Sequence, residues 1–269
     1  MSSTEGTDTV ARPLLALGGV VLIGVGVAVA FGWGLGSSVE RDATVAQQIR
    51  GVRLDADSGD VRIRTGSGPI SVHQKLHYNF RSEPGDAWRV DGDQLVLGDC
   101  GRSCTADFEV VVPAGLPVTG RADSGSLDIA GVGSVDVTAD SGPAQVANVA
   151  GSVNLRLDSG SIDLHDVGPV QLHTDSGHVS ADGVRGPVDI SADSGRVELA
   201  LASPNDVQVK ADSGSVDVRV PAGSYRVIGD SDSGHRSVLI PQYTQDTGGA
   251  GTKTLDLTTE SGSVTVKAA

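Results

Sequence analysis

The chain has 269 residues, of which 34 are acidic and 20 basic, so its formal net charge at pH 7 is −14. This balance argues against binding to nucleic acid, which needs a basic surface, and against adhesion to anionic lipid by charge alone. Aromatic residues make up only 3% of the chain, which rules out a core built on aromatic packing. The length suits one or two domains.

The first 50 residues predict a membrane anchor. Residues 1–12 are expected to be a short disordered tail. Pro13–Leu35 carries no charged residue over 23 positions, and about 20 helical residues cross a bilayer. We therefore expect a transmembrane helix over 13–35, with Trp33 in the headgroup zone at one end. The alternative is a signal peptide cleaved after Ala28-Val29-Ala30, which is less favoured because the apolar run is too long. Residues 36–50 are expected to be a polar linker.

The next segment, 51–122, is much longer than a repeat unit and contains the aromatic residues Tyr78, Phe80 and Trp88. We expect it to form longer strands and hairpins that cap the N-terminal end of a repeat structure, because the end of such a stack needs covering.

Both cysteines of the chain lie in this segment. Cys100 and Cys104 fall between two strand-like runs, 94–97 and 108–112. They are expected to close a hairpin tip as a disulfide, although two free thiols remain the alternative. A metal site needs about four ligands, and no other cysteine and no nearby histidine could complete one. A disulfide would favour an oxidising compartment, outside the membrane, for residues 36 onward.

A short repeat dominates residues 123–269. The tripeptide Asp-Ser-Gly, hereafter the DSG motif, begins at Asp57, and Glu260 begins a related Glu-Ser-Gly. Between them it begins at Asp123, Asp140, Asp158, Asp175, Asp193, Asp212 and Asp232, with spacings of 17, 18, 17, 18, 19 and 20 residues, and then 28 to Glu260.

Each unit contains two short runs in which small aliphatic residues alternate with polar ones. Leu127 with Ile129, and Val135 with Val137, show the pattern, which is typical of strands with one buried face. A meander of hairpins and a solenoid both fit. The nearly constant unit length favours the solenoid, because stacking equivalent coils fixes a period. The predicted fold is therefore all-β: a parallel β-solenoid of 17–20 residue coils, preceded by one transmembrane helix.

The DSG motif has two interpretations. In the first, the Asp carboxylate accepts backbone hydrogen bonds as an Asx-turn and Gly supplies a positive φ angle. In the second, stacking places the carboxylates about 4.8 Å apart and a row of cations such as Ca²⁺ binds them. The first is favoured, because the chain lacks the Gly-Gly-x-Gly-x-Asp spacing of calcium-binding β-rolls. No cofactor is expected.

Catalytic motifs are not evident. Carboxylates recur in every unit, so no single pair stands out for glycoside hydrolysis. The DSG serines have no nearby histidine in a nucleophile arrangement. The protein is therefore expected not to be an enzyme, with a carbohydrate-active β-helix enzyme as an alternative.

Three features together resemble a known family: the single N-terminal span, the segment VVVPAGLPV at 110–118, and the repeated SGxVxV units. Over residues 50–269 the chain is similar to a bacterial adhesin-type domain of unknown function found on cell-envelope proteins. The resemblance implies a β-solenoid, an envelope location and a part in adhesion or envelope-stress sensing. It brings no catalytic residues.

The expected function is that of a membrane-anchored, extracytoplasmic adhesin or envelope interaction module. The membrane would be contacted through Pro13–Leu35, and the partner would be an envelope or surface protein or a glycan, not nucleic acid. A regulatory protein that acts on a membrane partner during envelope stress is the alternative.

Overall fold

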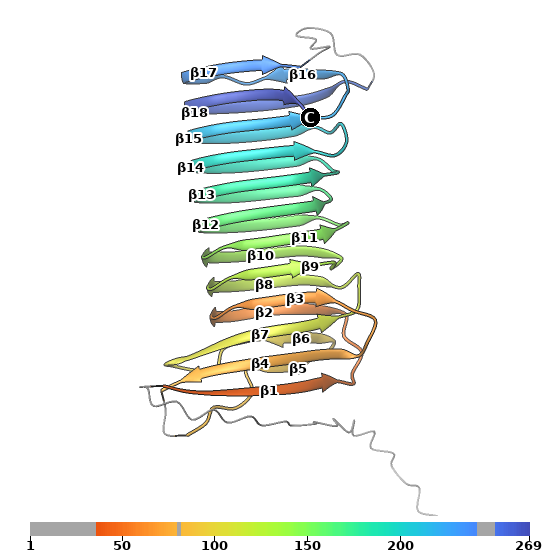
Figure 1. Cartoon of the computed structure of the whole chain (residues 1–269), viewed down its shortest axis with the longest axis vertical. Coiled ribbons are helices and arrows are strands. Elements are labelled where there is room, and N and C mark those ends of the chain that lie inside the picture. The colour runs from red at the N-terminus through yellow and green to blue at the C-terminus, as the bar shows by residue number, and fades with distance from the viewer. Residues whose placement is uncertain (1–35, 80–81, 241–250) are drawn as a thin grey trace, which may run out of the picture.

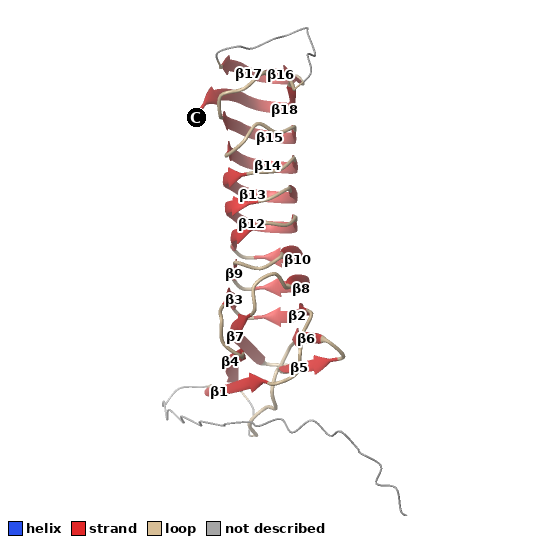
Figure 2. Ribbon diagram, turned by 90° about the vertical axis from the view of Figure 1, so that its right-hand side faces the viewer, coloured by secondary structure: helices blue, strands red, loops and turns tan. Residues whose placement is uncertain are grey.

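The computed structural model describes residues 36–79, 82–240 and 251–269, and in these ranges the chain consists of β-strands and their connections (Figures 1 and 2). Eighteen strands form one continuous sheet that is wound into a stack of coils. No helix in the described ranges is long and apolar enough to span a membrane. The predicted tail, 1–12, and the predicted membrane helix, Pro13–Leu35, lie outside these ranges.

The strands fall into an N-terminal group and a repeat group. The N-terminal strands are β1 (Ser37–Val45), β2 (Gly51–Ser58), β3 (Val61–Thr65), β4 (Ile70–Tyr78), β5 (Trp88–Asp91), β6 (Gln94–Leu97) and β7 (Cys104–Val112). The repeat strands are β8 (Pro117–Ser124), β9 (Leu127–Ala130), β10 (Ser134–Ser141), β11 (Ala144–Val149), β12 (Val153–Val167), β13 (Val170–Val184), β14 (Val188–Leu201), β15 (Val207–Val220), β16 (Tyr225–Ile228), β17 (Ser231–Leu239) and β18 (Lys253–Ala268).

The repeat is a parallel solenoid. Each unit forms one coil whose two halves lie on opposite sides of a narrow core, and equivalent residues of successive coils pair in parallel. Val153 pairs with Val170, and Val170 with Val188. The parallel arrangement confirms the predicted stacking and excludes a meander of antiparallel hairpins for the repeat. The DSG motif lies at the bend between the two halves and in β12–β15 is part of one continuous strand.

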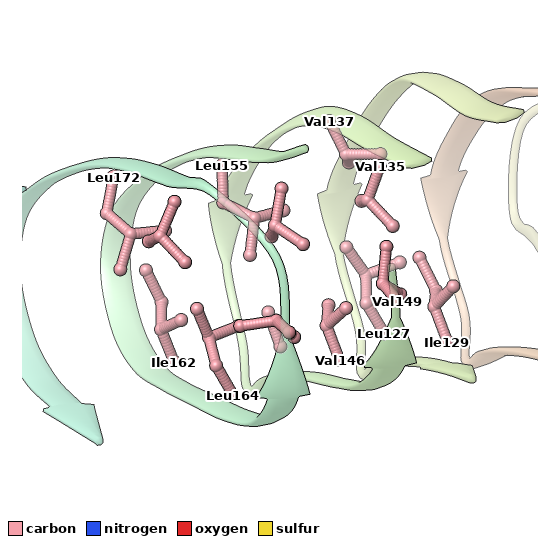
Figure 3. Packing of buried hydrophobic residues seen from close by; sticks show 14 of the residues in the cluster. Leu127, Ile129, Val135, Val137, Val146, Val149, Leu155, Ile162, Leu164 and Leu172 are labelled. Atoms are coloured by element: carbon pink, nitrogen blue, oxygen red, sulfur yellow. The ribbon is translucent and has the colours of Figure 1, made fainter. Parts of the chain in front are cut away.

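The core is a thin aliphatic layer between the two halves of each coil (Figure 3). Val135 and Val137 enter it from the first half, and Leu127 and Ile129 from the second, all at most 3% exposed. Residues two apart share a face of a strand, so the alternation seen in the sequence fills this layer. Burial of each such side chain contributes about 1.5–3 kcal/mol.

The linker predicted over 36–50 is wrong for most of its length. Ser37–Val45 forms β1, which pairs antiparallel with β4 over nine residues and lies at the N-terminal end of the stack. The sequence resembles a linker here because only Val39 and Val45 of β1 are buried, and three charged residues, Glu40, Arg41 and Asp42, follow Val39. Charged side chains on a strand at the edge of a sheet oppose further pairing.

The predicted hairpin around the cysteines is also wrong. β6 pairs with β2 and β5, whereas β7 pairs with β3 and β4, so β6 and β7 are the two halves of one coil. The cysteines therefore lie where the chain crosses from one side of the core to the other. Of the three aromatic residues named for this region, Tyr78 and Trp88 pack against the core while half-buried, and Phe80 lies outside the described residues.

Chain order and stacking order differ at both ends of the solenoid. After β7 the chain passes the β2–β3 coil and continues at β8–β9, on the far side of that coil. After β15 it passes one level to form β16 and β17, and β18 then fills the level left between them. Both crossings begin with Pro-Ala-Gly, at 113–115 and 221–223. The last strand in the sequence is therefore not the last in the stack.

The parallel levels run in the order β6–β7, β2–β3, β8–β9, β10–β11, β12, β13, β14, β15, β18 and β16–β17. Nine steps of about 4.8 Å give a rod of roughly 43 Å, with β1, β4 and β5 at its N-terminal end.

Candidate functional site

The seven predicted repeat aspartates form a single row along one edge of the rod. Their neighbouring serines pair from coil to coil, as Ser159 does with Ser176 and Ser176 with Ser194. The row therefore runs through Asp123, Asp140, Asp158, Asp175, Asp193, Asp212 and Asp232. Asp57 extends it at the N-terminal end, and Glu260 lies between Asp212 and Asp232 because β18 lies between β15 and β17.

Close approach of the backbone explains the glycine of the motif. Gly160 has φ +141° and Gly195 has φ +133°, conformations that L-residues with a side chain rarely adopt. A Cβ atom added to either glycine would overlap the carbonyl oxygen of the glycine in the preceding coil. The motif thus needs glycine both for its backbone angle and for the spacing of the stack.

The Asx-turn interpretation of the aspartates is wrong for the described residues. None of the seven repeat carboxylates accepts a backbone hydrogen bond there. The serine hydroxyls bridge coils instead: Ser124 Oγ donates to the Asp57 carbonyl at 3.2 Å, and Ser141 Oγ to the Asp123 carbonyl at 3.4 Å. An Asx-turn is not needed, because the backbone amides at the bend already take part in the parallel ladder.

Basic side chains balance part of the carboxylate row. The Arg121 guanidinium lies 3.7 Å from both Asp123 and Asp140. Arg156 plays the same part between Asp158 and Asp175, at 4.0 and 3.9 Å. All of these side chains are about half exposed, so each pair contributes little to stability.

The other half of the row has no such balance. Asp193, Asp212, Glu260 and Asp232 occupy successive levels, and within the described ranges none of them has an ion-pair partner. At the other end, partial burial and then the carboxylates of Asp99, Asp123 and Asp55 raise the pKa of Asp57. No three Asp, Glu, His or Cys side chains of the described chain converge as a metal site requires.

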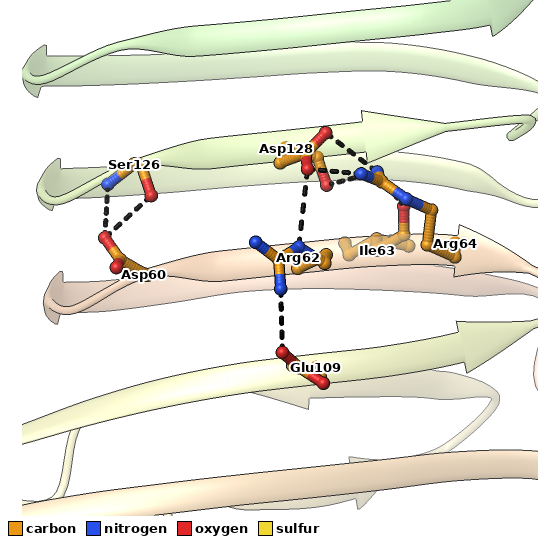
Figure 4. Close-up of polar contacts among 7 residues, drawn as sticks. All are labelled: Asp60, Arg62, Ile63, Arg64, Glu109, Ser126 and Asp128. Atoms are coloured by element: carbon orange, nitrogen blue, oxygen red, sulfur yellow. Dashed lines mark hydrogen bonds and ion pairs between the residues drawn. The ribbon is translucent and has the colours of Figure 1, made fainter.

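A denser polar network joins the N-terminal group to the repeat, on the outer face of β7, β3 and β9 (Figure 4). Arg62 bridges three levels, because it contacts Glu109 at 2.8 Å on one side and Asp128 at 3.4 Å on the other. Arg64 donates to Asp128 through both terminal nitrogens, Nη1 at 2.8 Å. The Arg64 bonds are the main reason that the pKa of Asp128 lies below its ordinary value.

Asp60 forms the second part of this network. Its carboxylate accepts bonds from the Ser126 hydroxyl at 2.7 Å and from the Ser126 backbone N–H at 2.9 Å. These bonds lower the pKa of Asp60, the hydroxyl bond contributing most. The sequence analysis did not single out these residues, because they occupy the same alternating polar positions as ordinary surface residues.

This network of Asp60, Arg62, Arg64, Glu109, Ser126 and Asp128, hereafter the clasp, holds neighbouring coils together through side-chain hydrogen bonds and ion pairs. Each of its carboxylates accepts bonds from an arginine or a serine. Two histidines of β4 are held similarly: His73 lies 2.8 Å from Asp42, and His77 lies 3.3 Å from Asp107. No nucleophile lies within hydrogen-bond distance of either histidine among the described residues.

The cysteines lie beside a hollow in the described surface. Cys100 and Cys104 are joined by a disulfide with a Cα–Cα distance of 5.6 Å. Cys104 lines a hollow of about 520 Å³, together with Ser37, Ser58, His77 and Tyr78. The lining is mostly hydroxyl-bearing and open to solvent, which is unlike the apolar, enclosed pockets that bind small molecules.

Comparison with known proteins identifies the family. The family model described as Toastrack DUF4097 matches residues 106–267, more than half of the chain. No curated protein matches.

Three solved structures are similar over 87% of this chain. One is a "putative cell adhesion protein" from Clostridium sporogenes, with 10% identity, a TM-score of 0.26 and 100% of its own chain covered. The second is a "putative adhesin" from Bacteroides fragilis, with 13% identity, a TM-score of 0.34 and 97% covered. The third is a "putative lipid binding protein" from Parabacteroides distasonis, with 11% identity, a TM-score of 0.39 and 98% covered. On the strength of the family match over its repeat, this chain belongs to the Toastrack DUF4097 family.

Proposed function

We propose that the protein is a membrane-anchored, extracytoplasmic adhesion module without enzymatic activity. The observation that carries the proposal is the uninterrupted parallel stack. It forms a stiff rod of roughly 43 Å whose N-terminal end is the end nearest the predicted anchor. A rod built on one regular ladder is suited to holding its far end away from a surface.

The outer surface of the rod supports a binding role over a catalytic one. Its charged side chains are spread along repeated rows, and those with the densest contacts, such as Arg62 and Asp128, bond to each other across levels. Catalysis needs a nucleophile or an acid–base pair held ready for a substrate. The repeat offers many equivalent carboxylates and no singular one.

The Cys100–Cys104 disulfide supports an extracytoplasmic location, because such bonds persist in oxidising compartments. Two measurements test the location together. A reporter fused after Ala269 should be active only outside the membrane, and Cys100 and Cys104 in intact cells should react with a thiol reagent only after reduction. A reporter active in the cytoplasm would overturn the proposed topology.

The adhesive role is tested by comparing cells that display the full chain with cells that lack it. Displaying cells should bind more firmly to one another or to an envelope preparation. Incubation with a panel of polysaccharides is the counter-test. Turnover that disappears on substitution of a single aspartate would show an enzyme and refute the proposal.

A further inference from the structure

The C-terminal end of the rod presents an open strand edge. β16 and β17 pair with β18 on one side, and no described strand pairs with them on the other. At the opposite end the outermost strand, β1, carries Glu40, Arg41 and Asp42 in succession. Such charges blunt an edge, whereas an edge with few of them is a template for another chain. In β17 the run beyond the motif, 235–239, has Arg236 as its one formally charged side chain.

The backbone hydrogen bonds between lower coils show which N–H groups of β17 point away from the stack. In lower coils, core-facing residues donate their N–H to the next coil: Leu127 N bonds to the Pro143 carbonyl at 2.9 Å. The glycine of the motif does the same, as Gly142 N bonds to the Ser159 carbonyl at 3.2 Å. Following the register upward, Arg236 takes the place of Leu127, and Gly234 that of Gly142. Their N–H groups therefore face outward, beyond the last coil.

The core itself is closed at this end. Arg236 occupies the row that holds Val216 and Val264 in the two levels below it. Its guanidinium donates to the carbonyl oxygens of Ile228, at 3.1 Å, and Gly229. The end of the rod is thus a polar strand edge. Leu239 lies at the end of this strand and is 62% exposed, and no other large hydrophobic side chain in the described ranges is classed as exposed.

Charge favours contact at this end over contact along the sides. Within residues 225–240, Arg226 and Arg236 balance Asp230 and Asp232, so the local net charge is zero. The whole chain carries −14, and much of that charge lies in the carboxylate row along the rod. Two copies side by side would repel each other, whereas two copies end to end would not.

We propose that two copies of this chain associate tip to tip through antiparallel pairing of their β17 strands. A two-fold axis makes such an interface self-complementary. The N–H group of Val238, two residues on from Arg236, faces outward in the same way. Pairing within the straight run 235–239, beyond the bend at the motif, places Arg236 opposite the partner's Val238, so that the outward-facing groups of each strand bond to those of the other. The axis then passes Ser237, which faces its own counterpart.

This inference deepens the proposed adhesive role and rests on it for its biological meaning. If the rod is anchored at its N-terminal end, the paired ends are those farthest from the membrane, and the partner of one anchored copy is another. The pairing itself is a property of the protein in solution. The pairing proposal can therefore fail while the anchoring proposal stands, and the anchoring proposal can fail while the pairing proposal stands.

Cross-linking tests the register directly. In an antiparallel pair, non-hydrogen-bonded residues lie about 4.5 Å apart at Cα, which is within the range of a disulfide. The full-length Ser237→Cys variant in mild detergent should form a covalent dimer on gentle oxidation. Asp163→Cys, in the same outer row on the side of the rod at β12, is the matched control and should stay monomeric. Equal cross-linking at the two positions would overturn the proposal.

Sedimentation of the full-length chain measures the dissociation constant of the dimer and its change in variants. Val238→Pro removes an outward N–H of β17, and Leu239→Lys places a charge beside the seam. Each should weaken the dimer about tenfold or more, as loss of one or two well-placed contacts does. Asp163→Lys is the control and should leave the dimer at least as strong. If Val238→Pro disturbs folding, Leu239→Lys carries the test alone. A chain that stays monomeric at about 100 μM, or variants that dimerise unchanged, would refute tip-to-tip pairing.

Vesicles separate this proposal from the function proposed above. Full-length protein that floats with vesicles but does not cluster them would be anchored and unpaired, which refutes the pairing alone. Protein that dimerises in detergent but does not float with vesicles would refute the anchor alone.

Discussion

Replacing a single motif glycine should damage the stack far more than replacing a glycine elsewhere, and the structure lets the cause be separated into two parts. At Gly195 the backbone has φ +133°, and a Cβ would overlap the Gly177 carbonyl oxygen. A side chain in a strained region of φ costs about 1–3 kcal/mol, and forced backbone movement in a packed structure costs about 1–3 kcal/mol more. Gly195→Ala should therefore lower stability by roughly 2–6 kcal/mol.

Two other glycines supply the matched controls. Gly92 has φ +63° but open space around its missing Cβ, so Gly92→Ala should cost only the conformational part, about 1–2 kcal/mol. Gly68 has open space and no positive φ, so Gly68→Ala should be neutral or stabilise by up to about 1 kcal/mol.

The assay should report on individual coils, because each coil contacts only its neighbours and a long stack need not unfold in one step. Hydrogen exchange at the buried amides of Val179 and Val197 gives the local opening free energy on either side of the replacement. Urea denaturation followed by circular dichroism gives the overall effect. If Gly195→Ala lies within about 1 kcal/mol of Gly92→Ala, close stacking is not what requires glycine, and the argument fails.

Other predictions concern the core and the clasp. Val188→Asp places an unpaired charge in the core and should cost several kcal/mol in urea denaturation. Asp166→Asn, at a half-buried position with φ +55° that Asn tolerates, should stay within about 0.5 kcal/mol, because the ion pair that it removes, with Arg185, is half exposed. Equal effects would contradict the assigned inward face. The Thr174 hydroxyl is buried without a hydrogen-bond partner, so Thr174→Val should raise stability by roughly 1 kcal/mol, and a loss of stability would show that the hydroxyl is satisfied. The pKa values of Asp60 and Asp128 are lowered in the folded state, so both carboxylates stabilise the folded protein when they are ionised. Their contribution to the free energy of unfolding is complete above the ordinary carboxyl pKa of about 4, and it is lost as the pH falls through the lower folded values. The urea midpoint should therefore fall with acidification in this range, and should fall less in a protein with Asp128→Asn.

The repeat could be predicted because each part of it depends on local pattern. Val135 and Val137 alternate with polar residues, and that alternation alone assigns strands and their buried face. The near-constant spacing of the DSG motif then selects stacking over hairpins. The seven aspartates were expected in one row, and the register places them there.

What could not be predicted depends on which strands become neighbours. β1 has too few buried residues to be distinguished from a linker, and it becomes a strand because β4 offers it an edge. Cys100 and Cys104 seemed to lie in a hairpin because β6 and β7 are adjacent in sequence, whereas their partners come from elsewhere in the chain. A charged residue such as Arg236 does not fit the aliphatic pattern of the core, and only the register shows that it stands in the core row.

The placement of β18 between β15 and the final coil makes assembly depend on a strand that is synthesised after the coil it supports. Residues 225–239 leave the ribosome before their native partner, β18, exists. Their native pairing must wait for Lys253–Ala268, which pairs with β15 on one side and with β16 and β17 on the other. A premature stop after residue 240 would therefore remove one level by deletion and leave the other without support, so that the rod would end at β15.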